Sequence, residues 1–494
     1  MPTRGKKDPN GRALRGRRAH TTFISDPIAQ LWSNYNIRSG VDGAITPEQP
    51  AVQNCLYDRF ETIYKKTSIK PSLLIVPARF KSGKLYSQIP TSGAGDFTVT
   101  RATNATRVNA SGLIESVASG IPRLDYFSSD GTVGCPALLV EPAAQNLALQ
   151  SENFLTTWTN TSLVITSGFT SPSNNSNGTL IEASANTGRL RQPFAAITSG
   201  TTHTFSLFAE AGNLALASGV SLVFQEGTAT NFVSGVVQSF RLDTGTLGAS
   251  GTLGAGFTLT RASIEDYGNG WYRCSMTVTV SYTPASANIS IRPTSTIVSN
   301  LPATVSGGTA YIWGAQLETG SVATSYIPTT TAAVTRNADV VSVSGAVSGS
   351  IGQTEGTMYA EFFVDFNNRN ADILSVDGGS TSNGFFMSIR SSSVVQLIVR
   401  TASANALIFQ RTGAYPTGVN KLAIAYKNGD FAISLNGTAA QTDSSTITMP
   451  SVSINRFSIA RSSLNNLDQQ LRIRAAALYT TRLSNAELAA LTSL

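Results

Sequence analysis

Alternation of apolar and polar residues is the feature that most constrains how this chain can fold. From Ser72 onward, runs such as "DFTVTRATNATRVN", "THTFSLFAEAG" and "KLAIAYKNGDFAISLNGT" alternate, and Gly, Pro, Asn or Asp residues separate them. A period of two places successive side chains on opposite faces of a strand, and turns at intervals of about 8–12 residues are typical of sandwiches. The pattern predicts a mainly β chain with two antiparallel β-sandwich domains of jelly-roll or lectin-like type, after a short helical and extended N-terminal anchor.

The same pattern predicts where the segments of the 494-residue chain begin and end. The expected segments are a basic extended arm (1–45), a helix (46–71), a β-rich connector (72–149), a first sandwich (150–328), a linker of small polar residues (329–350) and a second sandwich (351–494). Within the second sandwich, Asn428-Gly429 predicts a hairpin turn. Ser484, followed three residues later by Glu487, predicts the capping box of a short C-terminal helix.

The clearest helix pattern lies at 48–66, where apolar side chains recur at a spacing of three or four residues. Phe60, Ile63 and Tyr64 form one face of it, and the sequence offers no second helix nearby to cover that face. Burial of the same stripe from several copies would solve this problem, because symmetric oligomers bury identical surfaces. We therefore expect Phe60, Ile63 and Tyr64 to form an oligomer contact.

The net charge of +7 is concentrated in one short segment. Residues 1–20 contain seven basic residues and one acidic residue, which give +6, so the other 474 residues sum to +1. The basic residues of this arm are Arg4, Lys6, Lys7, Arg12, Arg15, Arg17 and Arg18. An arm with so little apolar surface does not fold alone, and it orders only against a partner such as nucleic acid or an acidic protein groove. A solvated tail is the alternative.

Composition excludes several classes of protein. Charged residues make up 13% of the chain, against about 25% in an average globular protein, which argues against a helical bundle or coiled coil. The sequence contains no run of about 18 apolar residues, so no membrane span is expected. No apolar run precedes Ile24, so no secretory signal is expected. Three scattered cysteines (Cys55, Cys135 and Cys274) form no CxxC pair and are interpreted as buried free thiols. With His20 in the arm, a histidine-based catalytic or metal site would depend on His203 alone, which lies in a strand pattern.

Several stretches together resemble a known family. "FKSGKLYSQIPTSGAGDFTVTRATNATRVNASGLIESV", "PRLDYF" and "PALLVEPAAQNLALQSENF" resemble the connector regions of tailed-bacteriophage virion appendage proteins, of the fibre, spike or decoration type. "EDYGNGWYRCSMTVTV" and "AYIWGAQLETGSVATSYIPTT" resemble the carbohydrate-binding-module-like jelly roll that follows in such proteins. The last 140 residues resemble a laminin-G/concanavalin-A-like sandwich. The resemblance covers residues 70–494 and does not extend to the arm.

The resemblance implies a structural protein of the virion, in a head, collar or tail fibre or spike, that contacts other virion proteins through its N-terminus. Fibres favour three-fold symmetry, so a homotrimer is the first expectation. Lectin-like sandwiches also imply host-surface glycan as a partner, although shared architecture does not transmit function. No enzymatic activity, membrane contact or cofactor is expected. A structural calcium remains open, with no residue assigned to it.

Aromatic side chains are the candidate sugar contacts, because a flat ring stacks on the apolar face of a pyranose. The candidates are Trp158, Trp271, Tyr272 and Trp313. Packing of the sandwich core is the competing role for Trp271, Tyr272 and Trp313, whereas Trp158 lies in the polar run "LTTWTNTS" and is expected to be more exposed. Two alternatives to the virion role remain: a glycan-degrading enzyme built on lectin-like modules, and an internal protein that binds nucleic acid through the arm. The nucleic-acid-binding alternative predicts basic residues beyond the arm, whereas the rest of the chain is nearly neutral.

Overall fold

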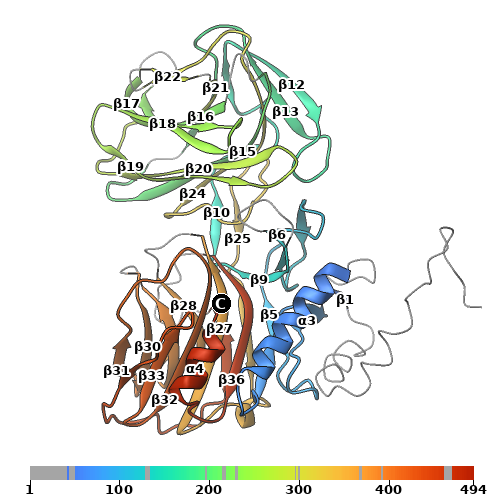
Figure 1. Cartoon of the computed structure of the whole chain (residues 1–494). Coiled ribbons are helices and arrows are strands. Elements are labelled where there is room, and N and C mark those ends of the chain that lie inside the picture. Colours follow the sequence, from blue (N-terminus) through green and yellow to red (C-terminus); the bar gives the residue numbers. More distant parts are fainter. Residues whose placement is uncertain are drawn as a thin grey trace, which may run out of the picture.

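A computed structural model describes residues 42–43, 50–127, 134–194, 197–213, 219–227, 232–294, 296–298, 301–365, 370–390, 393–460 and 470–494. Two stacked β-sandwiches dominate it (Figure 1). The predicted fold class is therefore confirmed. The basic arm, including Arg4, Lys6, Lys7, Arg12, Arg15, Arg17 and Arg18, lies outside the described residues.

The sandwich at the bottom of Figure 1 consists of a ten-stranded and an eight-stranded sheet that enclose one large apolar core. The ten-stranded sheet has the order β1 (Asp42–Gly43), β3 (Arg79–Lys81), β4 (Lys84–Leu85), β5 (Phe97–Thr100), β26 (Val340–Ser344), β35 (Arg456–Ile459), β28 (Ala371–Asp377), β29 (Gly384–Ile389), β30 (Val395–Thr401) and β31 (Ala404–Gln410). The eight-stranded sheet has the order β34 (Gln441–Asp443), β33 (Phe431–Leu435), β32 (Gly418–Lys427), β27 (Glu355–Val364), β36 (Leu471–Tyr479), β9 (Ala137–Val140) and β8 (Leu124–Asp125), with β2 (Leu73–Ile75) also paired to β36.

The upper sandwich consists of two six-stranded sheets around a second core. Its outer sheet has the order β11 (Thr159–Thr161), β14 (Arg189–Phe194), β21 (Ala287–Thr294), β16 (Gly219–Gly227), β17 (Phe232–Arg241) and β18 (Thr246–Leu253). The sheet nearer the lower sandwich has the order β12 (Leu163–Phe169), β13 (Gly178–Ala183), β24 (Thr309–Thr319), β15 (Thr202–Ala211), β20 (Trp271–Val280) and β19 (Phe257–Asp266). Three two-stranded pairs complete the description: β6 (Ala105–Val108) with β7 (Ile114–Val117), β10 (Ala144–Asn146) with β25 (Val334–Arg336), and β22 (Thr296–Val298) with β23 (Leu301–Ala303).

The upper sandwich is inserted into the lower one. Strands of the predicted connector 72–149 belong to the lower sandwich: β3, β4 and β5 continue its ten-stranded sheet, and β2, β8 and β9 pair with or beside β36. The predicted linker 329–350 contains β25, β26 and a 3₁₀ turn (Ser348–Ser350), and β26 lies between β5 and β35. The prediction of a separate connector and a free linker was therefore wrong. Local alternation identified the strands but carries no information about which distant strands they join.

The predicted helix is present as α3 (Pro50–Lys65), but its apolar face is not free. Phe60 is 0% and Ile63 2% exposed, and Tyr64 is partly buried. They pack on the outer face of the lower sandwich's eight-stranded sheet, where small side chains such as Ala475 and Ala477 leave room for a helix. The predicted oligomer contact of Phe60, Ile63 and Tyr64 was wrong, because the chain's own sheet covers the stripe.

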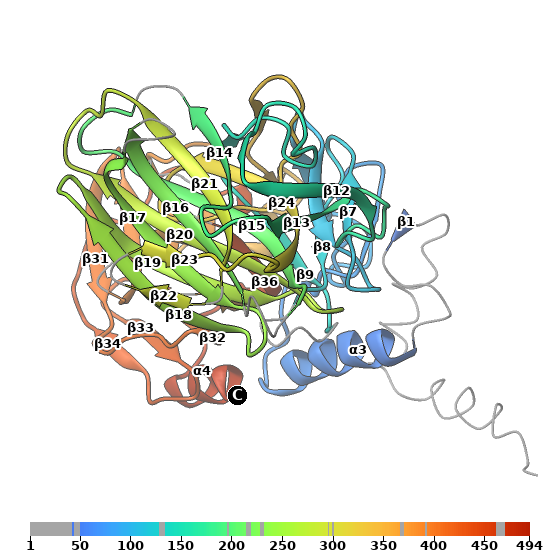
Figure 2. The ribbon, with the colours of Figure 1, turned by 90° about the horizontal axis from the view of Figure 1, so that it is seen from above.

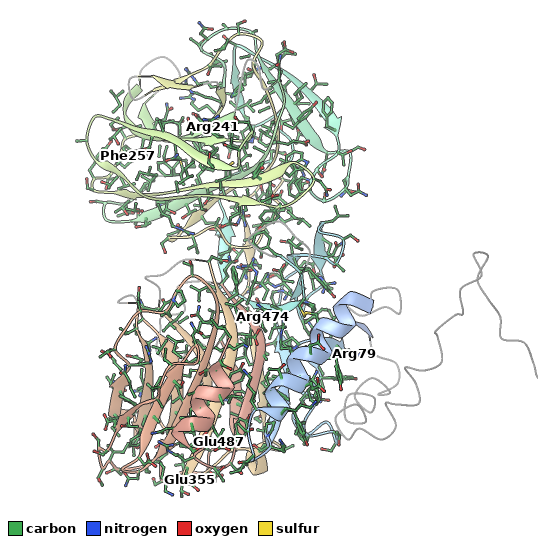
Figure 3. All side chains as sticks on the ribbon, in the orientation of Figure 1. Arg79, Arg241, Phe257, Glu355, Arg474 and Glu487 are labelled. Carbon is green, nitrogen blue, oxygen red and sulfur yellow. A yellow bond between two sulfur atoms is a disulfide. The ribbon has the colours of Figure 1, made fainter. Side chains whose placement is uncertain are left out.

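Two further contacts hold α3 in place. Cys55 of the helix is bonded to Cys135, with their Cα atoms 6.0 Å apart, so the interpretation of all three cysteines as free thiols was wrong for this pair. Cys274 is a buried free thiol, as expected. Glu361, under the helix, forms ion pairs with Arg59 (3.5 Å) and with Arg474 (3.0 Å). Figure 3 labels Arg474 beside α3.

The predicted C-terminal helix is confirmed as α4 (Asn485–Thr492), with the Ser484–Glu487 capping box formed in both directions. It lies on the same face of the lower sandwich as α3 (Figure 2), and Ser68 Oγ donates to Glu487 Oε1 at 2.5 Å. The hairpin predicted at Asn428-Gly429 is also confirmed: it joins β32 to β33, and Gly429 adopts a left-handed φ of +77°.

Candidate functional site

The most elaborate polar site lies where the chain crosses between the sandwiches. The chain enters the upper sandwich through β10 and returns through β25, and these strands pair antiparallel from Ala144–Arg336 to Asn146–Val334. Asn146 Nδ2 donates to the carbonyls of Ala315 (3.0 Å) and Ile327 (2.8 Å), which joins the crossing to the upper sandwich. Both passages of the chain are therefore held together at one junction.

A buried ion cluster lies at this junction. Arg123 donates to Glu141 at 2.6 Å and also contacts Asp339, while Arg101 donates to Asp339 at 2.8 Å and Arg336 lies 3.4 Å from Glu141. The side chains of all five residues are at most 2% exposed. The cluster joins segments on both sides of the insertion, because Arg123 and Glu141 precede the upper sandwich, and Arg336 and Asp339 follow it.

Neighbouring charges keep Glu141 ionised despite its burial. Burial alone would raise the pKa of Glu141, but the charges of Arg336 and Arg123 and hydrogen bonds from Ser325 hold that pKa well below its usual range. Ser325 belongs to the upper sandwich, and its Oγ donates to Glu141 Oε2 at 2.6 Å. Charges buried this deeply are tolerated only when they are paired and hydrogen-bonded. The cluster therefore ties the upper sandwich to the chain segments that carry it.

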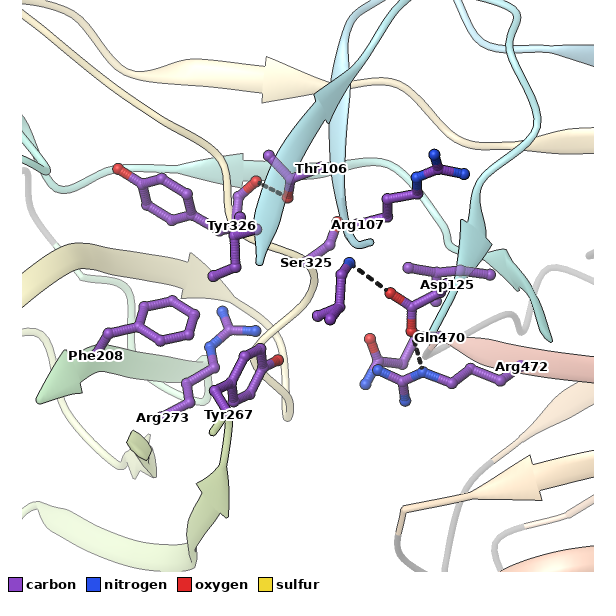
Figure 4. A pocket seen from close by; sticks show the side chains of 13 residues that line it. Thr106, Arg107, Asp125, Phe208, Tyr267, Arg273, Ser325, Tyr326, Gln470 and Arg472 are labelled. Carbon is purple, nitrogen blue, oxygen red and sulfur yellow. Dashed lines mark hydrogen bonds and ion pairs between the residues drawn. The ribbon is translucent and has the colours of Figure 1, made fainter. Parts of the chain in front are cut away.

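A small gap beside the cluster separates the two sandwiches (Figure 4). Phe208, Tyr267 and Arg273 face it from the upper sandwich, and Asp125 and Arg472 face it from the lower one. Its volume of about 20 Å³ has room for roughly one water molecule. Asp125 accepts from Arg472 Nε at 2.7 Å and from the backbone N–H of Val108 at 2.8 Å. This carboxylate is thus committed to holding the junction and has no space for a sugar beside it.

A larger cavity of about 240 Å³ lies on the β6–β25 side of the junction. Its lining is mostly small or apolar, and it includes Ala105, Ile327, Pro328 and Val334 together with the buried Arg336. The cavity belongs to the same junction, because Arg336 also contributes to the ion cluster.

The structure buries the three tryptophans predicted as sugar contacts. Trp158 is 4% exposed in the core of the upper sandwich, and its Nε1 donates to the Leu149 carbonyl at 3.2 Å. Trp271 (4% exposed) and Trp313 (1% exposed) belong to an aromatic cluster on the face toward the lower sandwich. The prediction that these tryptophans form an open sugar platform was therefore wrong. The competing interpretation, core packing, holds for Trp271 and Trp313. Tyr272 is half-buried, and burial raises the pKa of its hydroxyl.

A glycine makes the aromatic cluster possible. Gly314 adopts φ of +67°, and a Cβ there would lie 2.9 Å from Cδ2 of Phe208 and 3.2 Å from Cε2 of Tyr326. Trp313 and Tyr326 consequently approach to 4.4 Å between ring centroids, and Phe208 contacts both rings edge-on.

Sequence reasoning missed the ion cluster. Arg123 and Glu141 stand next to apolar residues in "PRLDYF" and "LLVEP", and charged residues are sparse in this chain. A charge inside a short apolar run is the signal that could have found them, since unpaired charges are rarely buried. In the described ranges, no group of three or more His, Cys, Asp or Glu side chains is arranged to hold a metal ion. No helix within the same ranges is long and apolar enough to cross a membrane.

Comparison with known proteins finds matches among solved structures only. No protein-family model matches the sequence, and no curated protein matches it. Among solved structures, the CBM40 of the Ruminococcus gnavus IT-sialidase is similar at 15% identity over 30% of this chain and 88% of that chain, with a TM-score of 0.26. The leech intramolecular trans-sialidase has 15% identity over 30% of this chain and 25% of that chain, with a TM-score of 0.26.

The binding domain of botulinum neurotoxin DC has 14% identity over 31% of this chain and 39% of that chain, with a TM-score of 0.25. Likenesses of this size cover less than a third of the chain and carry no conclusion about what it binds. The fold defines a class of two-sandwich β proteins in which one sandwich is inserted into the other.

Proposed function

We propose that this chain is a non-enzymatic structural component of a tailed-phage virion, attached to the particle through residues 1–45 and presenting its sandwiches to host-surface glycan. The observation that carries the proposal is the junction. Two strand crossings and a buried ion cluster join the sandwiches at one place, which favours a fixed relation between them. A projecting appendage needs such a relation, because a flexible link would lose the position that its anchor defines.

The sequence resemblance over residues 70–494 supplies the virion setting, and the charge confined to residues 1–20 supplies the anchor. Glycan contact fits the composition of the sandwiches, in which Ser, Thr and Asn greatly outnumber charged residues. Each such contact is weak, because water competes for the same hydrogen bonds. We expect a Kd per site of about millimolar to micromolar, with useful adhesion from many copies on one particle.

Removal of residues 1–45 tests the anchor. The truncated chain should keep the secondary structure of the full chain, apart from the two-residue edge strand β1, and its unfolding transition. It should no longer enter particles, as measured by copy number per particle. A full-length chain with the seven basic residues of the arm replaced by Gln is the matched control for charge. Normal incorporation of the truncated chain would contradict the proposal.

A glycan-degrading enzyme is the competing function. A reducing-sugar assay on host polysaccharide separates the two, since a structural protein releases no new sugar ends. Time-dependent release of reducing ends by the purified chain would overturn the non-enzymatic proposal.

A further inference from the structure

The ion cluster at the junction contains one more positive charge than negative charge. It consists of three arginines and two carboxylates, all buried: Arg101, Arg123, Arg336, Glu141 and Asp339. Among the described residues, no other carboxylate forms an ion pair with these arginines. On the adjoining strand β7, Glu115 pairs with Arg107 at 2.6 Å. On β8, Asp125 pairs with Arg472 at 2.7 Å. Because burial of a charge is costly unless the charge is paired, the junction is suited to one further anion.

Arg336 is the arginine of the cluster with the longest ion pair. Its Nη2 lies 3.4 Å from Oε2 of Glu141, and the same oxygen accepts from Arg123 at 2.6 Å. Nη1 of Arg336 donates to the carbonyl of Asn337 at 3.5 Å. Nε and Nη2 are buried and have no hydrogen-bond partner in the part of the chain that the structure describes. A guanidinium in this state can donate two parallel hydrogen bonds to one carboxylate.

The cavity on the β6–β25 side of the junction, here called the junction cavity, is lined in part by Arg336. Figure 1 shows β6 and β25 at the waist between the two sandwiches. Several residues of the lining are exposed, so the cavity opens to solvent: Asn104, Ser116, Pro328 and Thr335. A cavity of about 150 Å³ already holds a benzene ring. At about 240 Å³, the junction cavity has room for a molecule built on one ring.

The lining of the junction cavity favours a ligand with an apolar body. Its apolar residues include Ala105, Ile327, Pro328 and Val334. Two hydroxyls of the lining are engaged within the protein. Thr106 Oγ1 donates to the carbonyl of Tyr326 at 2.6 Å, and Thr103 Oγ1 accepts from the backbone N–H of Asn337 at 2.8 Å. A sugar ring would bring several hydroxyls to a lining with few free partners, and an unpaired buried hydroxyl costs free energy.

We propose that the junction cavity binds a small organic carboxylate with a single apolar ring, whose oxygens accept hydrogen bonds from Nε and Nη2 of Arg336. The bound carboxylate balances the third arginine of the cluster. Since a ligand that binds only the folded state stabilises that state, its binding also strengthens the junction. The inference goes beyond the virion and glycan proposals and does not depend on them, because the site uses neither the basic arm nor a sugar-binding surface.

The test uses the full-length chain with benzoate as the probe. Benzyl alcohol is its uncharged analogue, and glucuronate is a carboxylate with a hydroxylated ring. Isothermal titration calorimetry measures the Kd of each compound. Arg336→Gln removes the partner of the anion and leaves two arginines with two carboxylates, so the variant should still unfold cooperatively. Val334→Trp, at the rim, narrows the cavity and leaves every charge in place. Arg241→Gln and Val340→Trp are the matched controls, because both residues are exposed and lie outside the cavity lining.

We expect saturable binding of benzoate that is at least about tenfold weaker in Arg336→Gln and in Val334→Trp, and unchanged in both controls. Benzyl alcohol should bind the unsubstituted chain at least about tenfold more weakly than benzoate, because it carries no charge for Arg336. Benzoate should also raise the thermal unfolding midpoint, and the two cavity variants should reduce this rise.

Benzoate binding that is unchanged in Arg336→Gln would overturn the proposal, because the anion would then bind elsewhere. If Arg336→Gln does not fold, Val334→Trp decides in the same way. Tighter binding of glucuronate than of benzoate would overturn the assignment of an apolar ring. Absence of saturable binding for both carboxylates would show that the junction cavity holds water only, and the proposal would be wrong.

Discussion

At the scale of single residues, the buried charges of the junction are the groups on which the fold depends most. Arg123 is fully buried between Glu141 and Asp339. Burial alone would lower the pKa of Arg123, but the charges of Glu141 and Asp339 outweigh that effect and raise it above the ordinary value. Removal of one member of such a cluster leaves the remaining charges buried without compensation, which costs more than the net contribution of the intact cluster.

We predict that Arg123→Met lowers the free energy of unfolding by about 3–5 kcal/mol, the cost of breaking a buried pair. Denaturant titration followed by circular dichroism measures the change. Arg241→Gln is the control, because its partner Asp243 is solvent-accessible and the pair should contribute nothing measurable. A loss for Arg123→Met no larger than that of the control would show that the cluster does not hold the junction.

His203 provides a prediction of pH dependence. The side chain is 7% exposed, its ring lies near Phe194 and Phe224, and its Nε2 is 3.0 Å from Thr201 Oγ1. Burial lowers the pKa of His203 from 6.5, so the unfolded chain takes up this proton first as the pH falls. Stability from neutral His203 is therefore complete above about pH 6.5 and decreases below it.

Unfolding free energies measured from pH 8 to pH 5 test this sign. As the pH falls from 8 to 5, the free energy of unfolding should decrease more for the wild type than for His203→Gln. The difference between the two proteins separates the contribution of His203 from that of carboxylates that titrate in the same pH range. Parallel curves for the two proteins would contradict the prediction.

At the scale of elements, the sequence predicted what forms but not what it packs against. The stripe of Phe60, Ile63 and Tyr64 indicated an amphipathic helix, and α3 is present. Its partner is a sheet whose strand β36 lies more than 400 residues further along the chain, and a local pattern cannot reveal that contact. For the same reason the Cys55–Cys135 bond was missed, since the helix and the segment before β9 meet only in the folded chain.

The capping box and the hairpin were predictable because each depends on residues within a few positions of one another, such as Ser484 and Glu487. The candidate sugar contacts failed for a different reason. Alternation indicates on which face of its own strand each of Trp271 and Trp313 lies. It does not show that this face of the sheet meets another domain. The polar surroundings of Trp158 in the sequence were likewise misleading, because the chain folds that indole into the core.

We predict that Phe60→Ala lowers the free energy of unfolding by about 3–5 kcal/mol, as for other fully buried aromatic side chains. Tyr64→Ala is the matched control, because Tyr64 is only partly buried, and its loss should be smaller. Light scattering on the same samples should show an oligomeric state unchanged by Phe60→Ala. A shift from oligomer to monomer without loss of stability would restore the intermolecular role for this stripe.

At the scale of the whole molecule, the insertion makes the lower sandwich the host and the upper sandwich the guest. The segment before β10 and the segment after β25 contribute strands to the same two sheets. Neither segment alone can therefore form the core of the lower sandwich. The guest is reached through a paired two-strand stem, which the ion cluster braces from the host side. This organisation explains how a chain with few charges keeps two sandwiches in a fixed relation: it places several of those charges at one junction.

The insertion leads to a prediction about which fragments fold. Asn146 and Val334 are paired neighbours in the stem, so a two-residue Asn-Gly loop can join them as a hairpin and bypass the upper sandwich. We predict that residues 50–146 joined in this way to 334–494 give a soluble protein with a cooperative unfolding transition and β-type circular dichroism. Residues 351–494 alone, which alternation marked as a domain, lack β5, β9 and β26 and expose the core that these strands cover, so they should not unfold cooperatively. Denaturant titration of both fragments provides the measurement, and a cooperative transition for 351–494 with none for the joined chain would refute the insertion.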